Sequence, residues 1–140
     1  MATDPGALVL MTRLSRLVYR RATEEVLGMR IKQFAALSYL RQLPGIGQSQ
    51  LGDAMMLDAN NCVLLLNDIE AAGWAERRRD PADRRRHLVE ITPVGRKALE
   101  KAERALDGLE GEVLETLSPE ERDTLRELLA QALSGVPAPA

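Results

Sequence analysis

Aromatic side chains are scarce in this chain of 140 residues, and the whole set is Tyr19, Phe34, Tyr39 and Trp74. A core with so few rings must be packed by Leu, Val, Ile, Met and Ala, which is typical of a helix-rich protein. Cys62 is the single cysteine and His87 the single histidine. An intrachain disulfide is therefore excluded, a usual structural zinc site is not expected, and we predict no metal or other cofactor.

Long hydrophobic runs are also absent. No stretch approaches the roughly 20 apolar residues that a membrane-spanning helix requires, and no basic region followed by a signal-type apolar run opens the sequence. Cys62 and His87 fall on different predicted elements, and no Gly-rich phosphate loop or metal-spaced histidine pair accompanies them. We therefore expect a cytoplasmic protein that is not an enzyme and makes no membrane contact.

Charge is distributed unevenly, although the net charge is only −2. Residues 77–87 hold six arginines and two aspartates, a net charge of +4. Residues 98–127 hold four bases and ten acids, a net charge of −6. A chain polarised in this way can turn its basic segment toward phosphates while its acidic segment is repelled.

Apolar residues at spacings of three and four predict helices over 5–26, 30–42, 48–55 and 59–72. Asp58 is a good N-cap for the fourth of these helices, and Gly73 suits a left-handed conformation at its end. The core face of this helix is expected to be Cys62, Leu65, Leu66 and Ile69. Its opposite face carries Asn60, Asn61, Val63, Leu64, Asn67 and Asp68.

The period of the sequence changes after residue 73. Two short runs with β-branched or aromatic members, 74–79 and 87–92, flank four turn residues at 80–83. This pattern predicts a β-hairpin whose tip is rich in arginine.

Two further helices are predicted after the hairpin. Thr92 caps the first, which starts at Pro93, and a capping box at 118–121 opens the second. In the first of these helices, apolar residues are spaced three or four positions apart, namely Leu99, Ala102, Leu106, Leu109 and Val113. This spacing is typical of a helix that packs against a partner helix. Residues 135–140 contain two prolines and no periodicity, so we expect a disordered tail there.

The short helix and the capped helix, joined by a tight turn at 56–58, can form a helix-turn-helix whose second helix lies in the DNA major groove. The hairpin would then be a wing that reaches the neighbouring minor groove. With this order of elements, the sequence resembles the MarR family of bacterial regulators. The resemblance is carried by Asp80-Pro81-Ala82-Asp83-Arg84-Arg85-Arg86-His87, by Ile91-Thr92-Pro93-Val94-Gly95, and by Leu51, Leu57-Asp58, Ile69-Glu70 and Gly73.

The resemblance implies a mainly α protein with a small β-hairpin wing, a winged helix-turn-helix with long dimerisation helices. Residues 1–140 would form a single regulator with dimerisation helices at 1–28 and 93–134, a DNA-binding lobe at 30–92 and a tail at 135–140. It further implies a homodimer that binds double-stranded DNA at a pseudo-palindromic operator. Many members are repressors that a small-molecule effector releases from DNA.

The candidate DNA contacts are Gln48, Ser49, Asn60, Asn61, Val63, Leu64, Asn67, Arg84, Arg85 and Arg86. Asparagine can pair with adenine, and Val or Leu can touch a thymine methyl group, so an A/T-containing half-site is expected. Members of the family often carry an arginine near the position of Leu64, and without it strong guanine recognition by this helix is not expected. We expect Asn61 to meet base edges and Arg85 to reach phosphates or the minor groove, with Asp83 orienting an arginine.

The expected dimer interface is built from the first helix and the last two. Its residues are Leu10, Leu14, Leu17, Leu99, Ala102, Leu106, Leu109, Leu125 and Leu129. Together these helices expose more apolar surface than one small lobe could cover, so we expect an obligate homodimer.

Two alternative hypotheses bear on function. Some relatives sense peroxides through a cysteine of the first helix, which has none here, whereas Cys62 falls on a core face where cysteine behaves as a small hydrophobe. A winged-helix module that binds proteins without specific DNA would share the fold. Such a module has no reason to hold six arginines at a hairpin.

Overall fold

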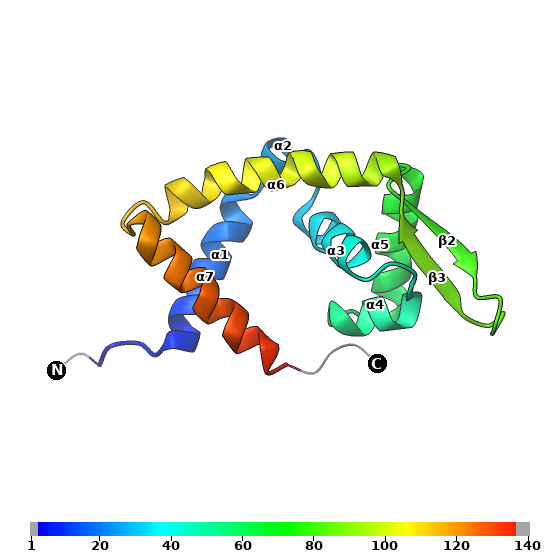
Figure 1. Cartoon of the computed structure of the whole chain (residues 1–140), viewed down its shortest axis with the longest axis horizontal. Coiled ribbons are helices and arrows are strands. Elements are labelled where there is room, and N and C mark those ends of the chain that lie inside the picture. Colours follow the sequence, from blue (N-terminus) through cyan, green and yellow to red (C-terminus); the bar gives the residue numbers. More distant parts are fainter. Residues whose placement is uncertain (1–2, 137–140) are drawn as a thin grey trace.

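The computed structural model describes residues 3–136, over which the chain forms helices and three short strands (Figure 1). In chain order these are α1 (Ala7–Arg21), α2 (Glu24–Leu27), α3 (Ile31–Gln42), β1 (Ile46–Gly47), α4 (Gln48–Ala54), α5 (Ala59–Ala71), β2 (Ala75–Arg79), β3 (His87–Ile91), α6 (Pro93–Val113) and α7 (Pro119–Ser134). The long helix α6 spans the molecule, with α1 and α7 toward one end, α2 beside its middle, and α3, α4, α5 and the sheet toward the other end (Figure 1). No helix among the described residues is long and apolar enough to cross a lipid bilayer.

The helices predicted over 30–42, 48–55 and 59–72 are confirmed. The bounds of α3, α4 and α5 lie within one residue of the predicted helices. Asp58 caps α5 by accepting a hydrogen bond from the Asn61 backbone N–H at 2.7 Å. Just after α5, Gly73 has a φ of +78°, which a residue with a side chain adopts at a cost.

Tight packing at Gly95 fixes how α6 leaves the sheet. Thr92 caps α6, and its hydroxyl also donates to the Gly73 carbonyl at 2.6 Å. A Cβ added to Gly95 would lie 2.0 Å from the carbonyl oxygen of Trp74. Only glycine allows this approach of helix to backbone, and it sets the direction in which α6 projects from the sheet.

The first predicted helix, 5–26, is wrong as a single element. The structure divides it into α1 and α2, with the break at Ala22, which is 3% exposed. The Thr23 hydroxyl accepts a hydrogen bond from the Val26 backbone N–H and so caps a new helix. Apolar spacing continues across the break, and this is why periodicity alone joined the two segments.

The sheet has one strand more than the predicted hairpin. Strands β2 and β3 pair antiparallel as expected, from Ala75 opposite Ile91 to Arg79 opposite His87. Strand β1 adds to the other edge of β3, with Ile46 opposite Val89, so the strand order is β1-β3-β2. Two residues are too few to show the alternation by which a strand is recognised in sequence.

The core lies where α2, α3, α4, α5, the sheet and the first half of α6 meet. Its largest fully buried side chains are Leu27, Met29, Leu37, Leu40, Leu51, Leu66, Ile69, Val89 and Leu99. Leu99 and Ala102 are both 0% exposed in the single chain and leave no surface for a partner, so their expected place in a dimer interface is corrected to this core. Neither α1 nor α7 contains a buried residue over its described length.

The expected tail starts immediately after α7. Gly135 and Val136 are exposed, and residues 137–140 lie outside the described part of the chain.

Candidate nucleic-acid interface

Helices α4 and α5 form the predicted helix-turn-helix. Gly52 of α4 allows close packing, because a Cβ there would lie 3.4 Å from the Cys62 sulfur of α5. The turn between the helices is held by a hydrogen bond from the Leu57 N–H to the Gly52 carbonyl at 2.9 Å. Met56 in this turn has a φ of 56° and is 90% exposed. The arrangement places the start of α5 at the surface.

The outer face of α5 carries amide and aliphatic side chains. Cys62, Leu65, Leu66 and Ile69 are buried, as predicted. Opposite them, Asn60, Leu64 and Asn67 recur at i, i+4 and i+7 and are exposed, Leu64 by 54%. Val63 is half-buried beside this stripe. A polar stripe with one aliphatic member is suited to contact base edges in a groove.

The three asparagines of α5 differ in what their amides already bind. The Asn61 Nδ2 donates to Asp58 Oδ2 at 3.0 Å, and the Asn67 Oδ1 accepts from Arg77 Nη2 at 2.5 Å. Among the side-chain hydrogen bonds within residues 3–136, none involves the Asn60 amide. Both the oxygen and the nitrogen of the Asn60 amide are thus available to bind a ligand.

The wing consists of β2, β3 and the connecting residues 80–86. At its tip, Asp83 Oδ1 accepts hydrogen bonds from Arg85 Nε at 3.2 Å and from the Arg85 backbone N–H at 3.1 Å. These bonds hold the pKa of the Asp83 carboxyl below its ordinary value. The Arg85 side chain is 92% exposed. Asp83 therefore contacts an arginine whose side chain is almost fully exposed at the tip.

Several arginines of the wing are engaged within the chain. Arg78 pairs with Glu90 across the strands at 2.9 Å, and Arg79 donates to the carbonyl of Arg84 at 2.6 Å. Arg86 reaches back to α4, where Gln50 accepts from it at 3.4 Å. Over residues 3–136 no ion pair includes Arg84 or Arg86, and the two remain available to phosphates together with Arg85.

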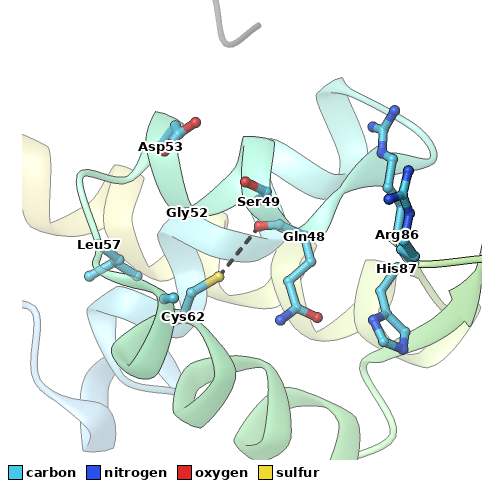
Figure 2. A pocket seen from close by; sticks show the side chains of 10 residues that line it. Gln48, Ser49, Gly52, Asp53, Leu57, Cys62, Arg86 and His87 are labelled. Carbon is cyan, nitrogen blue, oxygen red and sulfur yellow. Dashed lines mark hydrogen bonds between the residues drawn. The ribbon is translucent and has the colours of Figure 1, made fainter.

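A cavity of about 290 Å³ lies where α4, the start of α5 and the wing meet (Figure 2). Gln48 and Ser49 of α4 line it together with Arg85 and Arg86, so the structure brings four of the predicted contacts to one place. The Gln48 Oε1 is buried there and has no hydrogen-bond partner within the described residues. Figure 2 shows Arg86 and His87 on the opposite side of Gln48 from Cys62.

Cys62 forms part of the wall of this cavity. Its thiol lies 3.6 Å from the Gln48 carbonyl oxygen, and burial raises the pKa of the thiol. The sulfur in the cavity wall is therefore a protonated thiol, which is a weak nucleophile.

Two contributors to this surface were not anticipated from the sequence. Arg77 of β2 fixes the Asn67 side chain, and Gln50 links the α4 N-terminus to the wing by accepting from the Gly47 N–H at 3.0 Å. Glutamine at the third position of a helix is a known capping signal and could have indicated Gln50. Nothing in the sequence pairs Arg77 with Asn67, because that contact depends on how the sheet packs on α5.

An apolar surface lies far from the wing, on α1 and α7. Its strongly exposed members are Leu8, Leu10, Leu128 and Leu133, at 75%, 50%, 58% and 68%. Between α1, α6 and α7 runs an apolar groove of about 430 Å³. Leu14, Leu106, Leu109, Leu125 and Leu129, all expected at a dimer interface, line it.

A helix-turn-helix followed by a β-hairpin wing defines a winged helix protein, as the sequence predicted. A sequence model of the MarR family matches residues 29–87. The transcriptional regulator HosA of Escherichia coli O111:H- is 31% identical over 102 residues, which cover 73% of this chain and 76% of HosA. A candidate transcriptional regulatory protein for the hcr operon of Thauera aromatica is 35% identical over 96 residues, which are 69% of this chain but 58% of that relative.

A solved MarR structure has the same fold. The crystal structure of a MarR mutant from E. coli complexed with operator DNA matches with a TM-score of 0.73 and 26% identity, over 89% of this chain and 91% of that chain. The chain belongs to the MarR family of transcriptional regulators. The family and the named relatives are regulators of transcription rather than enzymes.

Proposed function

We propose that this protein is a cytoplasmic, homodimeric transcription regulator that binds a pseudo-palindromic double-stranded DNA operator. The observation that carries the proposal is the exposed stripe Asn60, Leu64 and Asn67 of α5 beside a wing whose Arg85 is 92% exposed. A helix with such a stripe fits the major groove, and an arginine on a neighbouring wing suits the adjacent minor groove. The likeness to a MarR structure complexed with operator DNA supports the same docking.

The proposed contacts follow the predicted set, with one refinement. Gln48, Ser49, Val63 and Leu64 would lie along the groove, and Arg84, Arg85 and Arg86 would meet phosphates or the minor groove. Asn61 remains in the proposed interface, but its Nδ2 is already bound to Asp58. Asn60, whose amide is free, is the better candidate for pairing with adenine through both atoms.

Homodimerisation is proposed from the apolar surface of α1 and α7. The dimerisation helices would be 1–28 and 93–134, and the DNA-binding lobe 30–92. Of the expected interface, Leu10, Leu14, Leu17, Leu106, Leu125 and Leu129 keep some exposure and are retained, whereas Leu109 is only 8% exposed. Two lobes related by a two-fold axis would contact two half-sites of one operator.

We further propose that the regulator is a repressor that a small-molecule effector releases from DNA. This part of the proposal rests on membership of the family. It predicts that an effector lowers operator affinity without unfolding the protein.

The test is titration of the purified protein with a duplex from the DNA upstream of its own coding sequence, and with a scrambled duplex, at several salt concentrations. Arg85→Ala should weaken binding to both duplexes and reduce the slope of log affinity against log salt by about one for each phosphate that the variant leaves unpaired. Asn60→Ala should leave the slope nearly unchanged and reduce discrimination at one base pair per half-site by about 1–3 kcal/mol.

Arg104→Ala is the matched control for charge, because Arg104 is exposed on α6 outside the proposed interface. It should leave affinity and slope close to wild type. If Arg85→Ala changes neither affinity nor slope and Asn60→Ala is neutral on the operator, the docking proposed here is wrong. A protein-binding winged helix would then be the better hypothesis.

A further inference from the structure

Hydrogen bonds within the chain set what Asn67 can offer to a base. A free asparagine amide has one acceptor oxygen and an NH₂ group with two donor hydrogens, and pairing with adenine through both atoms requires the oxygen as well as the nitrogen. The Asn67 Oδ1 accepts from Arg77 Nη2 at 2.5 Å. This bond uses one of the two lone pairs of the oxygen and holds the oxygen against Arg77. The NH₂ group is the part of the amide that has no hydrogen-bond partner within residues 3–136.

The chemistry of Arg77 leaves no choice about which end of the amide faces it. A guanidinium group has only donors, so an amide rotated by 180° would place two donors against each other. Arg77 is itself held in place, because its Nε donates to Glu70 Oε2 at 2.7 Å and its side chain is only 24% exposed. Glu70 and Asn67 are both on α5, so strand β2 holds the amide through a fixed arginine.

We propose that Arg77 is a positioning residue that holds the Asn67 oxygen and leaves the NH₂ group to donate, and so gives the operator half-site a guanine at the base pair Asn67 faces. This differs from the sequence expectation, which considered only the missing arginine near Leu64. This inference rests on the proposed function, in which α5 lies in the major groove. Guanine presents two adjacent acceptors there, O6 and N7, whereas adenine presents N7 beside the N6 amino donor. An NH₂ group whose amide oxygen is held by Arg77 is matched by guanine and meets a like donor on adenine.

Asn60 and Asn67 would then have opposite preferences although they are the same residue type. Seven residues separate them on one face of α5, a rise of about 10 Å at roughly 1.5 Å per residue. This spans about three base steps of roughly 3.4 Å. Asn60 would pair with adenine, Leu64 would contact a thymine methyl group between them, and Asn67 would donate to guanine.

The experiment selects duplexes from a random-sequence library with the full-length wild type, Arg77→Met and Arg78→Met. Wild type should enrich a half-site with guanine at the Asn67 position. In Arg77→Met the amide oxygen is released, so the ratio of guanine to adenine at this one position should fall by about tenfold. Arg78→Met removes the same charge from the same strand, but Arg78 pairs with Glu90 and should leave the ratio unchanged.

A second variant tests the inference without removing Arg77. Asn67→Asp keeps an acceptor for the guanidinium and presents a second acceptor outward, so the preference should change from guanine to cytosine, whose N4 amino group is a donor. If Arg77→Met shows no folded state in a thermal melt, the base preference of Asn67→Asp is the test of which group at position 67 faces the base.

The outcomes distinguish a failure of the proposed function from a failure of the role proposed for Arg77. If wild type enriches no sequence, the proposed function fails. If wild type enriches a half-site but Arg77→Met gives the same profile as Arg78→Met, and Asn67→Asp gives the profile of wild type, the inference about Arg77 fails while the proposed function stands.

Discussion

Cys62 of α5 lies between α4 and α5 as a small, buried apolar side chain, where an oxidant has little access to it. It is 3% exposed, a Cβ added to Gly52 would lie 3.4 Å from its sulfur, and burial raises the pKa of its thiol. Only a thiolate attacks the peroxide O–O bond at an appreciable rate, and Cys62 is a buried thiol, so DNA binding by wild type should be insensitive to hydrogen peroxide. Cys62→Ala should bind DNA equally well but unfold with about 1 kcal/mol less stability, because the smaller side chain packs less well. DNA titrations with and without peroxide, and urea denaturation, measure the two effects.

If peroxide releases wild type from DNA while Cys62→Ala stays bound, the thiol is a sensor and the core interpretation is wrong.

Most side chains of the candidate site could be chosen from the sequence, but their hydrogen-bond state could not. Helical spacing identified the outward asparagines of α5, and the turn residues identified the arginines of the wing. The sequence could not distinguish Asn60 from Asn67, because the difference comes from Arg77, ten residues further along the chain, on another element. Such a contact depends on the packing of β2 against α5, which residue spacing does not encode.

At the scale of elements, Arg41 of α3 and Glu103 of α6 join the lobe to the long helix. Two parallel hydrogen bonds link them, at 2.5 and 2.6 Å, and lower the pKa of Glu103 while raising that of Arg41. The side chains are 35% and 36% exposed, so solvent screens the pair and its contribution should not exceed about 1 kcal/mol. Glu103→Gln should therefore lower the melting temperature by about 3 °C at neutral pH.

The pH dependence of this difference follows from the lowered pKa of Glu103. The stabilisation is complete above the pKa of an unfolded glutamate, about 4.3, and is lost as pH falls through the lower pKa of the folded state. Melting curves of wild type and Glu103→Gln should therefore converge in acid. Glu115→Gln, an exposed acid that forms no ion pair among residues 3–136, should show no such convergence. A Glu103→Gln deficit that stays constant down to acid pH would exclude the ion pair as its cause.

Elements were predictable where they were long and capped. Helices α5, α6 and α7 carry an N-cap that the sequence identifies, namely Asp58, Thr92 and Ser118. Strand β1 was missed because its two residues acquire their structure only by pairing with β3. The apolar residues of α6 share one spacing but lie on two different surfaces. Leu99 packs in the core of the lobe, and Leu106 lines the groove between α1, α6 and α7. Periodicity identifies a buried face but not the partner that buries it.

The whole molecule has its basic wing and its apolar helices at opposite ends of α6 (Figure 1). The leucines of α1 and α7 are not buried within the single chain, and exposed apolar patches of this kind mark interfaces. A second copy of the chain would cover this surface and hold the two wings apart, so that both could contact one face of a DNA duplex. Assembly and operator binding should therefore be linked.

Leu133→Lys tests this link. Leu133 is 68% exposed, lines the groove between α1, α6 and α7, and belongs to no core cluster, so lysine there should leave the lobe folded. A stable dimer would bury upwards of about 1,000 Å² at this interface, and desolvating a lysine there costs several kcal/mol. Sedimentation at micromolar concentration should give twice the 15.5 kDa chain mass for wild type and a smaller mass for the variant.

The control is Leu64→Lys, which places the same charge on a leucine that is 54% exposed on α5. It should keep the dimer mass and change only DNA binding. Leu133→Lys should weaken affinity for the two-half-site operator by at least about 100-fold, because each lobe then binds without the high effective concentration that its linked partner supplies. Its affinity for a single half-site should equal that of wild type. A wild-type protein that sediments as a folded monomer, or a Leu133→Lys variant that remains dimeric with full operator affinity, would refute the assembly proposed here.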